Sequence, residues 1–382
     1  MITLAKDTID KDDIGQLIEW LQTYPRLTKG PVTLRLEKKW SQWIGRKYSI
    51  FCNSGSSANL LMLAALKEGQ YLRNDKIVVP SLAWSTDLSP VMQLGLDPIL
   101  CDCNMEDLSA NLEHVEKIFQ EFNPAAFMFV SVLGLVPDMI RVRKLCDEYG
   151  VILIEDTCES MGCAFDGKKL GTFGEMSSFS TYFGHHISTI EGGFVSTDNK
   201  ELYELLLSLR SHGWGRDLSA TTQHKLQEEW DVCDFNSLYT FYYPAFNLRS
   251  TDLQAFIGLR QIDKLDEWGS RRQENFLTYQ SLIDNDHWKP KPQPESFISN
   301  FAYPVIHPNR GAMVEELQRN QIEVRPLICG SLGTQPFYVK KYGKLILPNV
   351  SQVDKCGFYV PNHPRLTIEQ IGLIADIINE EM

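Results

Sequence analysis

Two neighbouring histidines, His185 and His186, stand in the stretch SSFSTYFGHHISTIEGGFVST, shortly before an EGG turn. An imidazole has a pKa near ~6.5, so it can accept and return a proton at neutral pH, as general acid–base catalysis requires. Neighbouring side chains in an extended segment point to opposite sides, so only one of the two can face a ligand. The pair therefore predicts one histidine that transfers protons and one that supports it.

A second group of candidate residues lies in ILIEDTCES, where Asp156 ends a very apolar segment and Glu159 follows one short turn later. An unpaired carboxylate is costly at the end of a buried strand, so Asp156 needs a cationic partner. A protonated ring nitrogen of a bound ligand would serve as that partner, with Glu159 beside the ring. The residue can equally be the N-cap of a helix, and this segment alone leaves both interpretations open.

Two further stretches can hold a flat, phosphorylated ligand. In NSGSSANLL, Gly55 and Ser56 place backbone N–H groups at the start of an expected helix, which suits a phosphate. In SLAWSTD, Trp84 follows an expected strand, where its indole can stack on a planar ring. A plain connecting turn and a core tryptophan are the alternatives, and they are the commoner case for such residues.

These residues follow segments that read as strands of an α/β protein. The segments DKIVVPSLAW, AAFMFVSVLG and GVILIEDTCES are apolar throughout and alternate with helical patterns, which predicts a mainly parallel sheet covered on both faces. Ligands bind such sheets beyond the carboxyl ends of the strands. A proline-rich stretch, HWKPKPQPESF, leads into a smaller region. We therefore predict a large α/β domain over residues 1–262 and a smaller C-terminal α+β domain over residues 263–382.

The composition narrows the classes of function. The 382 residues carry 37 Lys+Arg against 49 Asp+Glu, a net charge of −12, and no long basic run, which argues against nucleic-acid binding. The first residues, MITLAKDTIDKDD, do not resemble a signal peptide, and the longest apolar run is too short to span a membrane. Nine scattered cysteines, with one C-x-C at Cys101 and Cys103, favour reduced thiols in a cytoplasmic protein without a metal centre.

Several stretches together resemble the sugar-nucleotide aminotransferase and dehydratase family, which has the aspartate-aminotransferase fold. They include NSGSSANLLMLAAL, VVPSLAWST, IEDTCESMGCAFDGKKLGTFG, SFSTYF, EGGFVST, LRSHGW, FNLRSTDLQAFIGL and RPLICGSLGTQPF, in the family's order. The resemblance implies pyridoxal 5′-phosphate (PLP) or pyridoxamine 5′-phosphate (PMP) as cofactor. It also implies the residues that bind this cofactor, with the ring held as described above and the phosphate held at Gly55, Ser56 and Ser180. Asn247 would reach the phosphate of the neighbouring subunit, so the resemblance implies a homodimer with shared active sites.

The chain departs from most of this family at one position. Aminotransferase relatives carry the cofactor-binding lysine five residues after the phosphate-binding serine, and five residues after Ser180 is His185. Lys168 and Lys169 lie well before this point, in what reads as an exposed turn. A minority branch, the sugar 3-dehydratases, is similar in carrying histidine here. PMP brings its own amine, so such an enzyme needs a base but no tether. The spacing favours His185 as that base over His186.

The resemblance implies a lyase that removes the C3 hydroxyl of a nucleotide-linked 4-keto-6-deoxyhexose to give a 4-keto-3,6-dideoxy sugar. One dehydratase subtype uses an iron–sulfur cluster and a reductase, but the later half of this chain offers only Cys233, Cys329 and Cys356, and four thiolates are needed. We therefore expect the subtype that needs no reductase and regenerates PMP from glutamate. GDP and mannose follow from the resemblance alone.

Three residues are weaker candidates for contacts with the substrate or with glutamate: His212, Arg216 and Arg325. A buried packing role for the histidine and surface ion pairs for the arginines are the alternatives. Two other functions also stay open, an aminotransferase that uses an unconventional lysine and a non-catalytic PLP-binding protein. The second is disfavoured because Asp156, Ser180 and Trp84 are all present.

Overall fold

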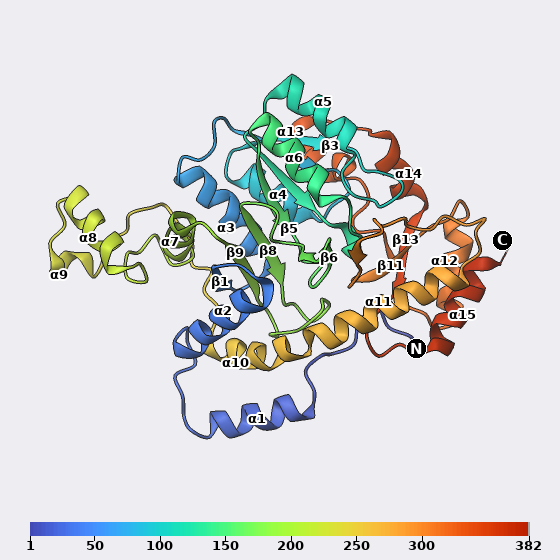
Figure 1. Cartoon of the computed structure of the whole chain (residues 1–382), viewed down its shortest axis with the longest axis horizontal. Helices are drawn as coiled ribbons and strands as arrows, with labels where there is room; N and C mark the ends of the chain where they lie inside the picture. The colour runs from blue at the N-terminus through green and yellow to red at the C-terminus, as the bar shows by residue number, and fades with distance from the viewer. Residues whose placement is uncertain (381–382) are drawn as a thin grey trace.

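A seven-stranded sheet forms the centre of the structure, a computed structural model that describes residues 1–380 (Figure 1). The strand order is β1-β9-β8-β5-β4-β2-β3, and β9 runs antiparallel to both of its neighbours while the pairs from β8 to β3 are parallel. The strands are β1 (Tyr48–Cys52), β2 (Lys76–Pro80), β3 (Asp97–Cys101), β4 (Ala126–Val130), β5 (Ile152–Asp156), β8 (Met176–Ser180) and β9 (Gly193–Thr197). The predicted large, mainly parallel sheet is confirmed.

Helices cover both faces of this sheet because successive strand residues point to opposite sides. Phe179 of β8 and Phe194 of β9 pack with Trp40 on one face, where the Trp40 and Phe194 rings stack with centroids 4.2 Å apart. Met176 and Val195 of the same strands belong to the core on the other face. The helices of this part are α1 (Lys11–Leu21), α2 (Pro31–Ile44), α3 (Gly55–Glu68), α4 (Ser85–Gln93), α5 (Leu112–Phe122), α6 (Met139–Tyr149), α7 (Lys200–Leu209) and α10 (Asp252–Gln261), with the 3₁₀ turns η1 (Val132–Gly134) and η2 (Ile262–Lys264).

The later part of the chain forms a smaller α+β layer beside the large sheet. Its antiparallel sheet has the order β11-β13-β12, and the long helix α11 runs from the large sheet to pack against α15 (Figure 1). The strands are β11 (Ala302–Ile306), β12 (Arg325–Pro326) and β13 (Gly357–Pro361), and the helices are α11 (Leu265–Leu282), α12 (Arg310–Arg319), η3 (Leu332–Thr334), α13 (Pro336–Tyr342), α14 (Pro348–Cys356) and α15 (Ile368–Asn379). A third small sheet joins β10 (Ser296–Phe297), β6 (Ala164–Phe165) and β7 (Lys168–Lys169).

The first residues of the chain lie with this later part. The Ile2 N–H donates to the Gln321 carbonyl oxygen at 2.8 Å, and the Ile2 carbonyl oxygen accepts from the Glu323 N–H at 2.9 Å. The earliest residues, which were predicted to belong to the large domain, therefore pair with the smaller α+β layer. The predicted domain boundary at residue 262 stays a prediction. Nothing in the sequence of the first ten residues signals this pairing.

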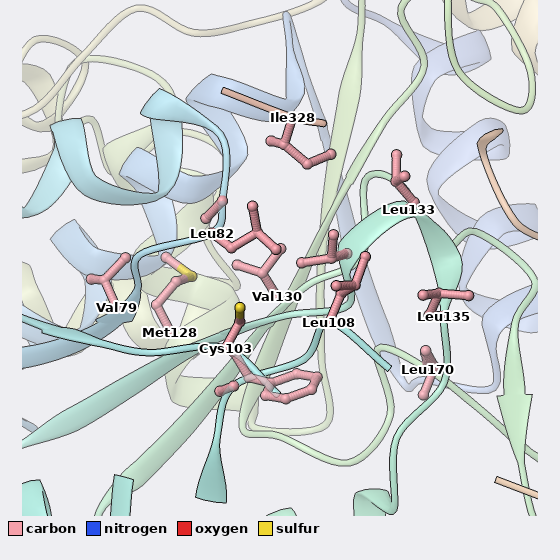
Figure 2. Close-up of a cluster of buried hydrophobic side chains, with 14 of the residues drawn as sticks. Val79, Leu82, Cys103, Leu108, Met128, Val130, Leu133, Leu135, Leu170 and Ile328 are labelled. Atoms are coloured by element: carbon pink, nitrogen blue, oxygen red, sulfur yellow. The ribbon is translucent and has the colours of Figure 1, made fainter. Parts of the chain in front are cut away.

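One continuous core joins the two parts beneath the carboxyl ends of the strands. Figure 2 shows side chains of this core, among them Val79 of β2, Met128 and Val130 of β4, and Ile328 from the later part of the chain. All five residues of β4 are buried, as the apolar run predicted. The packing fixes the later part against the strand ends, where the residues singled out in the sequence lie.

A short helical arm leaves the body after α7. It contains α8 (Ala220–Glu229) and α9 (Asp234–Ser237) and projects away from the sheet (Figure 1). Its large apolar side chains are more than half exposed, namely Trp230, Phe235, Leu238, Tyr239 and Phe241. Scattered exposed apolar residues are ordinary, but five within twelve positions are the pattern of a contact surface.

Candidate active site

A cleft of about 500 Å³ opens at the carboxyl ends of β2, β4, β5 and β8. This is the edge where an open α/β sheet binds its ligands. The cleft brings together the residues that the sequence analysis assigned to a cofactor ring, a cofactor phosphate and a proton-transfer group: Gly55, Ser56, Trp84, Asp156, Glu159, Ser180 and His185. No lysine is among its lining residues in the described part of the chain.

The N-terminus of α3 forms an anion site at one end of the cleft. Ser54 is the N-cap and accepts from the Ser57 N–H at 3.0 Å, while the N–H groups of Gly55 and Ser56 are the first of the helix and have no intrahelical acceptor. A Cβ on Gly55 would lie 2.7 Å from the Ser180 Cβ and 2.9 Å from the Cys158 Sγ. Only glycine therefore lets the end of β8 approach the helix so closely. The arrangement fits a phosphate held by two backbone N–H groups and a serine hydroxyl.

Asp156 ends β5 and is buried, yet its hydrogen-bond partners carry no positive charge. Its Oδ2 accepts from the Asn59 amide at 2.6 Å, and its Oδ1 accepts from the Cys158 N–H at 2.8 Å. A buried carboxylate with two neutral donors can still accept a bond from a cation, and such a bond would offset the cost of its burial. The protonated nitrogen of a pyridine ring fits this requirement.

Trp84 supplies a flat surface over the same space. The residue is the N-cap of α4, and its side chain is 54% exposed although it lines the cleft. Its backbone N–H donates to the Asp87 Oδ2 at 3.0 Å, which fixes the main chain that carries the ring. An indole left open to solvent at a cleft is placed to stack on a planar ligand.

His185 lies in the loop between β8 and β9, and its side chain is only partly exposed. Its ring packs on Phe301 with centroids 5.2 Å apart, and its Nδ1 is buried without a hydrogen-bond partner in the described residues. Burial lowers the pKa of His185 to about 4, while the charge of Asp156 opposes this change. The imidazole is therefore neutral at pH 7 and ready to accept a proton. A phosphorylated ligand would raise this pKa again, because an anion favours the imidazolium.

His186 points away from the cleft. It is buried, and its Nε2 lies 2.7 Å from the carbonyl oxygen of Ser299 in the later part of the chain. Burial also lowers the pKa of His186 well below its ordinary value. The two histidines diverge as expected, but the extended conformation assumed for them is wrong. The His185 N–H bonds to the Tyr182 carbonyl oxygen at 2.9 Å, so the segment is a turn.

Glu159 is another carboxyl group that lines the cleft with Asp156. Its Oε2 accepts from the Leu133 N–H at 2.7 Å, which supports the tight turn η1. Burial, together with the charge of Asp156, raises the pKa of Glu159 to about 8 even though the Leu133 N–H opposes the shift. The carboxyl group is therefore mostly protonated at pH 7 and can donate a hydrogen bond to a ligand oxygen.

Four other predicted site residues do not line the cleft of their own chain: Asn247, His212, Arg216 and Arg325. The Asn247 Oδ1 accepts from the Arg249 Nε at 3.0 Å. Arg216 lies over the Trp214 ring at 4.1 Å, and Arg325 pairs with Glu323 at 2.6 Å. His212 is exposed beside the base of the arm. Any role of these four residues at a cleft therefore requires that the arm region and the small layer meet a second chain or a large ligand.

The sequence analysis missed several residues of the cleft. Phe301, Ile328 and Tyr359 come from the later part of the chain and form its second wall. Ile328 lies in the stretch RPLICGSLGTQPF but was given no role there, and no motif marks Phe301 or Tyr359. Asp87 stands three residues after Trp84 in a stretch that was examined for its tryptophan alone. An acidic residue three positions after a helix N-cap commonly accepts a hydrogen bond from the N-cap backbone N–H, and this spacing could have identified Asp87.

The cleft fits PLP or PMP on its own geometry. It offers an anion site, a flat apolar surface and a buried carboxylate, each supplied by a different strand end, as described above. Within residues 1–380 there is no group of three or more His, Cys, Asp or Glu side chains that could hold a metal ion. All nine cysteines are free, and five of them are buried. Among the described residues, no helix is long and apolar enough to cross a membrane.

Comparison with known proteins places the chain in a family. The model of the DegT/DnrJ/EryC1/StrS aminotransferase family matches residues 7–379. The chain is 31% identical to the GDP-4-keto-6-deoxy-D-mannose 3-dehydratase of Yersinia pseudotuberculosis, over 99% of this chain and 98% of the relative. It is 28% identical to the GDP-perosamine synthase of Escherichia coli O157:H7, over 92% of this chain and 91% of the relative.

Solved structures show the same likeness. A crystal structure of a histidine-to-asparagine mutant of GDP-4-keto-6-deoxymannose 3-dehydratase, with bound GDP-perosamine, superimposes with a TM-score of 0.89 and 29% identity, covering 99% of this chain and 100% of that one. The Escherichia coli enzyme of the same name, with bound hydrated PLP, gives a TM-score of 0.89 and 29% identity, covering 99% of each chain.

Proposed function

The chain belongs to the DegT/DnrJ/EryC1/StrS aminotransferase family, and we propose that it removes the C3 hydroxyl group of GDP-4-keto-6-deoxy-D-mannose. It is a lyase that works with PLP and PMP on a sugar nucleotide. The product is a nucleotide-linked 4-keto-3,6-dideoxy sugar; the amine nitrogen is released as ammonia when the 4-keto group reforms, and PMP is then regenerated from PLP with the amine of glutamate. The observation that carries this proposal is the cleft itself, where a histidine stands among residues that fit a cofactor and where no lysine is found among the described lining residues.

The cofactor would be held by the chain without a covalent bond. Gly55, Ser56 and Ser180 would bind its phosphate, Trp84 would stack on its ring, and the Asp156 carboxylate would accept a hydrogen bond from its protonated pyridine nitrogen. Bound PMP supplies an amine that condenses with the 4-keto group and a ring that accepts electrons. Asp156 would keep the ring nitrogen protonated, and the protonated ring accepts electrons more readily.

His185 would move the proton. Its neutral imidazole accepts a proton from the cofactor carbon that bears the amine, and the imidazolium then donates a proton to the departing C3 hydroxyl group. A lysine, with an ordinary pKa near ~10.4, would be mostly charged at pH 7 and would also form a covalent bond to PLP. The Phe301 ring packs on the His185 ring and would help to hold the imidazole in place.

Glutamate is the proposed source of the amine, and no reductase is required. The later half of the chain has three cysteines, which is fewer than the four thiolates of an iron–sulfur cluster. Asp156 would serve both half-reactions, because the protonated ring must accept electrons in each direction. Each dehydration should therefore be matched by one 2-oxoglutarate.

The proposed active unit is a homodimer with shared active sites. Asn247 lies outside the cleft of its own chain, at the base of the arm whose large apolar side chains are exposed. A second copy that covers the arm would bury those side chains and would bring Asn247 toward the other cleft. Size-exclusion chromatography with light scattering should give twice the chain mass of 43.7 kDa.

A direct test combines the purified protein, PMP, glutamate and GDP-4-keto-6-deoxy-D-mannose, followed by mass spectrometry of the sugar nucleotide. We expect loss of the C3 oxygen, retention of the 4-keto group, and formation of 2-oxoglutarate without added iron or reductase. Omission of PMP and glutamate is the control. A dTDP-linked 4-keto-6-deoxy sugar should react much more slowly if GDP is part of the recognised substrate.

An aminotransferase is the second candidate, because GDP-perosamine synthases are among the relatives. Such an enzyme would place an amino group on C4 and keep the C3 oxygen. The absence of a lysine from the cleft of the described residues argues against it. Gain of nitrogen with retention of oxygen in the same assay would establish the aminotransferase and would reject the dehydratase.

A further inference from the structure

Asp87 is a buried carboxyl group in the cleft to which neither the sequence analysis nor the proposed mechanism gives a role. Its side chain is 1% exposed and stands on the first turn of α4. Its Oδ2 accepts from the Trp84 N–H at 3.0 Å, which closes the first turn of the helix at the residue that carries the stacking ring. The Asp87 carboxyl group is therefore hydrogen-bonded directly to the backbone of Trp84.

The same carboxyl group is joined to Asp156 through one amide. The Asn59 Nδ2 donates to the Asp156 Oδ2 at 2.6 Å and lies 3.2 Å from the Asp87 Oδ1. Asn59 is fully buried, and its Oδ1 accepts from the Ser178 hydroxyl at 2.5 Å, so the amide cannot turn over without losing this bond. Asn59 thus holds the Asp87 carboxyl group of α4 beside the Asp156 carboxyl group at the end of β5.

The charges around Asp87 favour a neutral carboxyl group. Burial raises the pKa of Asp87 well above its ordinary value, and the neighbouring charge of Asp156 and a hydrogen bond to it raise the pKa further. Glu159 also faces it, and the thiols of Cys158 and Cys329 lie within range of its charge. No lysine or arginine lines this cleft in the described residues, so no permanently charged side chain offsets the repulsion between the two aspartates, and a proton on Asp87 would relieve it.

We propose that Asp87 is a positioning residue of the cofactor site, a neutral carboxyl group that fixes the Trp84 backbone and, with Asn59, holds the Asp156 carboxylate under the cofactor ring. Trp84, which would stack on the cofactor ring, and Asp156, which would bind the ring nitrogen, are then joined by hydrogen bonds through Asp87 and Asn59. Asp87 acts through these two residues and takes no part in proton transfer. This inference rests on the cofactor placement proposed above.

The test measures PMP binding by calorimetry in the absence of any sugar nucleotide, with native protein and two variants. Asp87→Ala removes the bridge and should weaken PMP binding about tenfold or more, the order expected when hydrogen bonds to a charged group are lost. Asp87→Asn keeps an acceptor for the Trp84 N–H and a donor toward Asp156, and loses only the weaker 3.2 Å acceptor for the Asn59 amide, so it should recover most of the lost affinity.

A matched control separates positioning from stability. Asp107 is also a buried aspartate whose pKa is raised by burial, and it accepts from the Ser109 N–H at 3.0 Å outside the cleft. Asp107→Ala should lower the Tm of the cofactor-free protein and leave PMP affinity near native. Asp87→Ala should instead reduce the rise in Tm that PMP produces.

A double-mutant cycle tests the route through Trp84. If Asp87 acts by placing this ring, the loss of affinity in the Asp87→Ala/Trp84→Ala double variant should be smaller than the sum of the two single losses. Native PMP affinity in Asp87→Ala, equal losses in Asp87→Asn and Asp87→Ala, or additive losses in the cycle would each overturn the inference. Failure of the native protein to bind PMP would reject the proposed function and this inference together.

Discussion

At the rim of the cleft and in the interior just behind it, residues of the same type are neighbours in the chain but face different surroundings. One member of each pair lines the cleft, and the other bonds within the fold. Glu155 and Asp156 are neighbours at the end of β5, and both are buried. The Glu155 carboxylate accepts three backbone N–H groups, from Gly171, Phe173 and Gly174, at 2.6 to 2.7 Å. Asp156 has two neutral donors and an open side that faces the cleft.

The histidine pair repeats this contrast. His186 faces the interior and contacts the Ser299 carbonyl oxygen, which ties the loop to the later part of the chain. His185 faces the cleft with its Nδ1 buried and without a partner in the described residues. In both pairs the interior residue bonds to backbone groups elsewhere in the fold, while the rim residue lines the cleft; the Nδ1 atoms of both histidines are buried without a partner in the described residues. The difference indicates which member is free to serve a ligand.

The largest expected effect separates the two histidines. His185→Asn should lower dehydration by about 10²-fold or more, the range for loss of a general acid–base group, while PMP still binds through Asp156, Ser180 and the start of α3. His186→Asn should keep most of the activity and lose stability. Single-turnover rates with PMP-loaded protein measure both variants. Near-native rates in His185→Asn, with loss in His186→Asn, would reverse the assignment.

A smaller effect separates the two acids. Asp156→Asn should lower glutamate-driven PMP formation and sugar dehydration together, each by about tenfold or more, because an amide cannot hold the ring nitrogen protonated. Glu155→Gln is the matched control at the neighbouring residue. Its amide cannot satisfy three N–H donors, so we expect a loss of about 1–3 kcal/mol in the free energy of unfolding and little change in rate per folded molecule. A reversed pattern would contradict the contrast.

The smallest effect is a pH dependence of stability. The pKa of His186 is lowered by burial, so below pH 6.5 the unfolded chain takes up a proton that the folded chain refuses, and stability falls as pH falls. Glu159, with its pKa raised to about 8, acts in the opposite direction below pH 8. Denaturant titrations of native protein and His186→Asn at pH 7 and pH 5 isolate the histidine. The native protein should lose more stability than the variant over this interval, by up to about 1.4 kcal/mol per pH unit. Equal losses would place His186 in a less buried setting.

The sequence predicted the sheet and most of the cleft because both depend on local patterns. Apolar runs such as that of β4 indicate strands buried on both faces, and the residues that follow such strands must meet at one edge. Asp156, Ser180 and the start of α3 meet there for this reason. The count from Ser180 to His185 needs only the motif spacing, and the structure places His185 in the cleft.

Other parts of the site depend on packing that local patterns do not encode. Phe301 and Tyr359 reach the cleft only because the later part of the chain folds back on the strand ends. The two histidine side chains point in different directions, as predicted, but the backbone there is a turn at Tyr182–His185 and not the extended segment from which this was predicted. The bridge from Asp87 through Asn59 to Asp156 joins three separate segments, and spacing alone cannot show that they meet.

The mechanism requires that residue 185 stands at the cofactor's reactive carbon, and a lysine placed there tests this directly. His185→Lys restores an amine at the position where relatives carry lysine, so PLP should bind covalently and borohydride should make the bond permanent. Peptide mass mapping should then find the reduced cofactor on residue 185, with His186→Lys as the unlabelled control. Cofactor found on residue 186, or no covalent cofactor in His185→Lys despite PLP binding, would contradict the placement of His185 and the mechanism built on it.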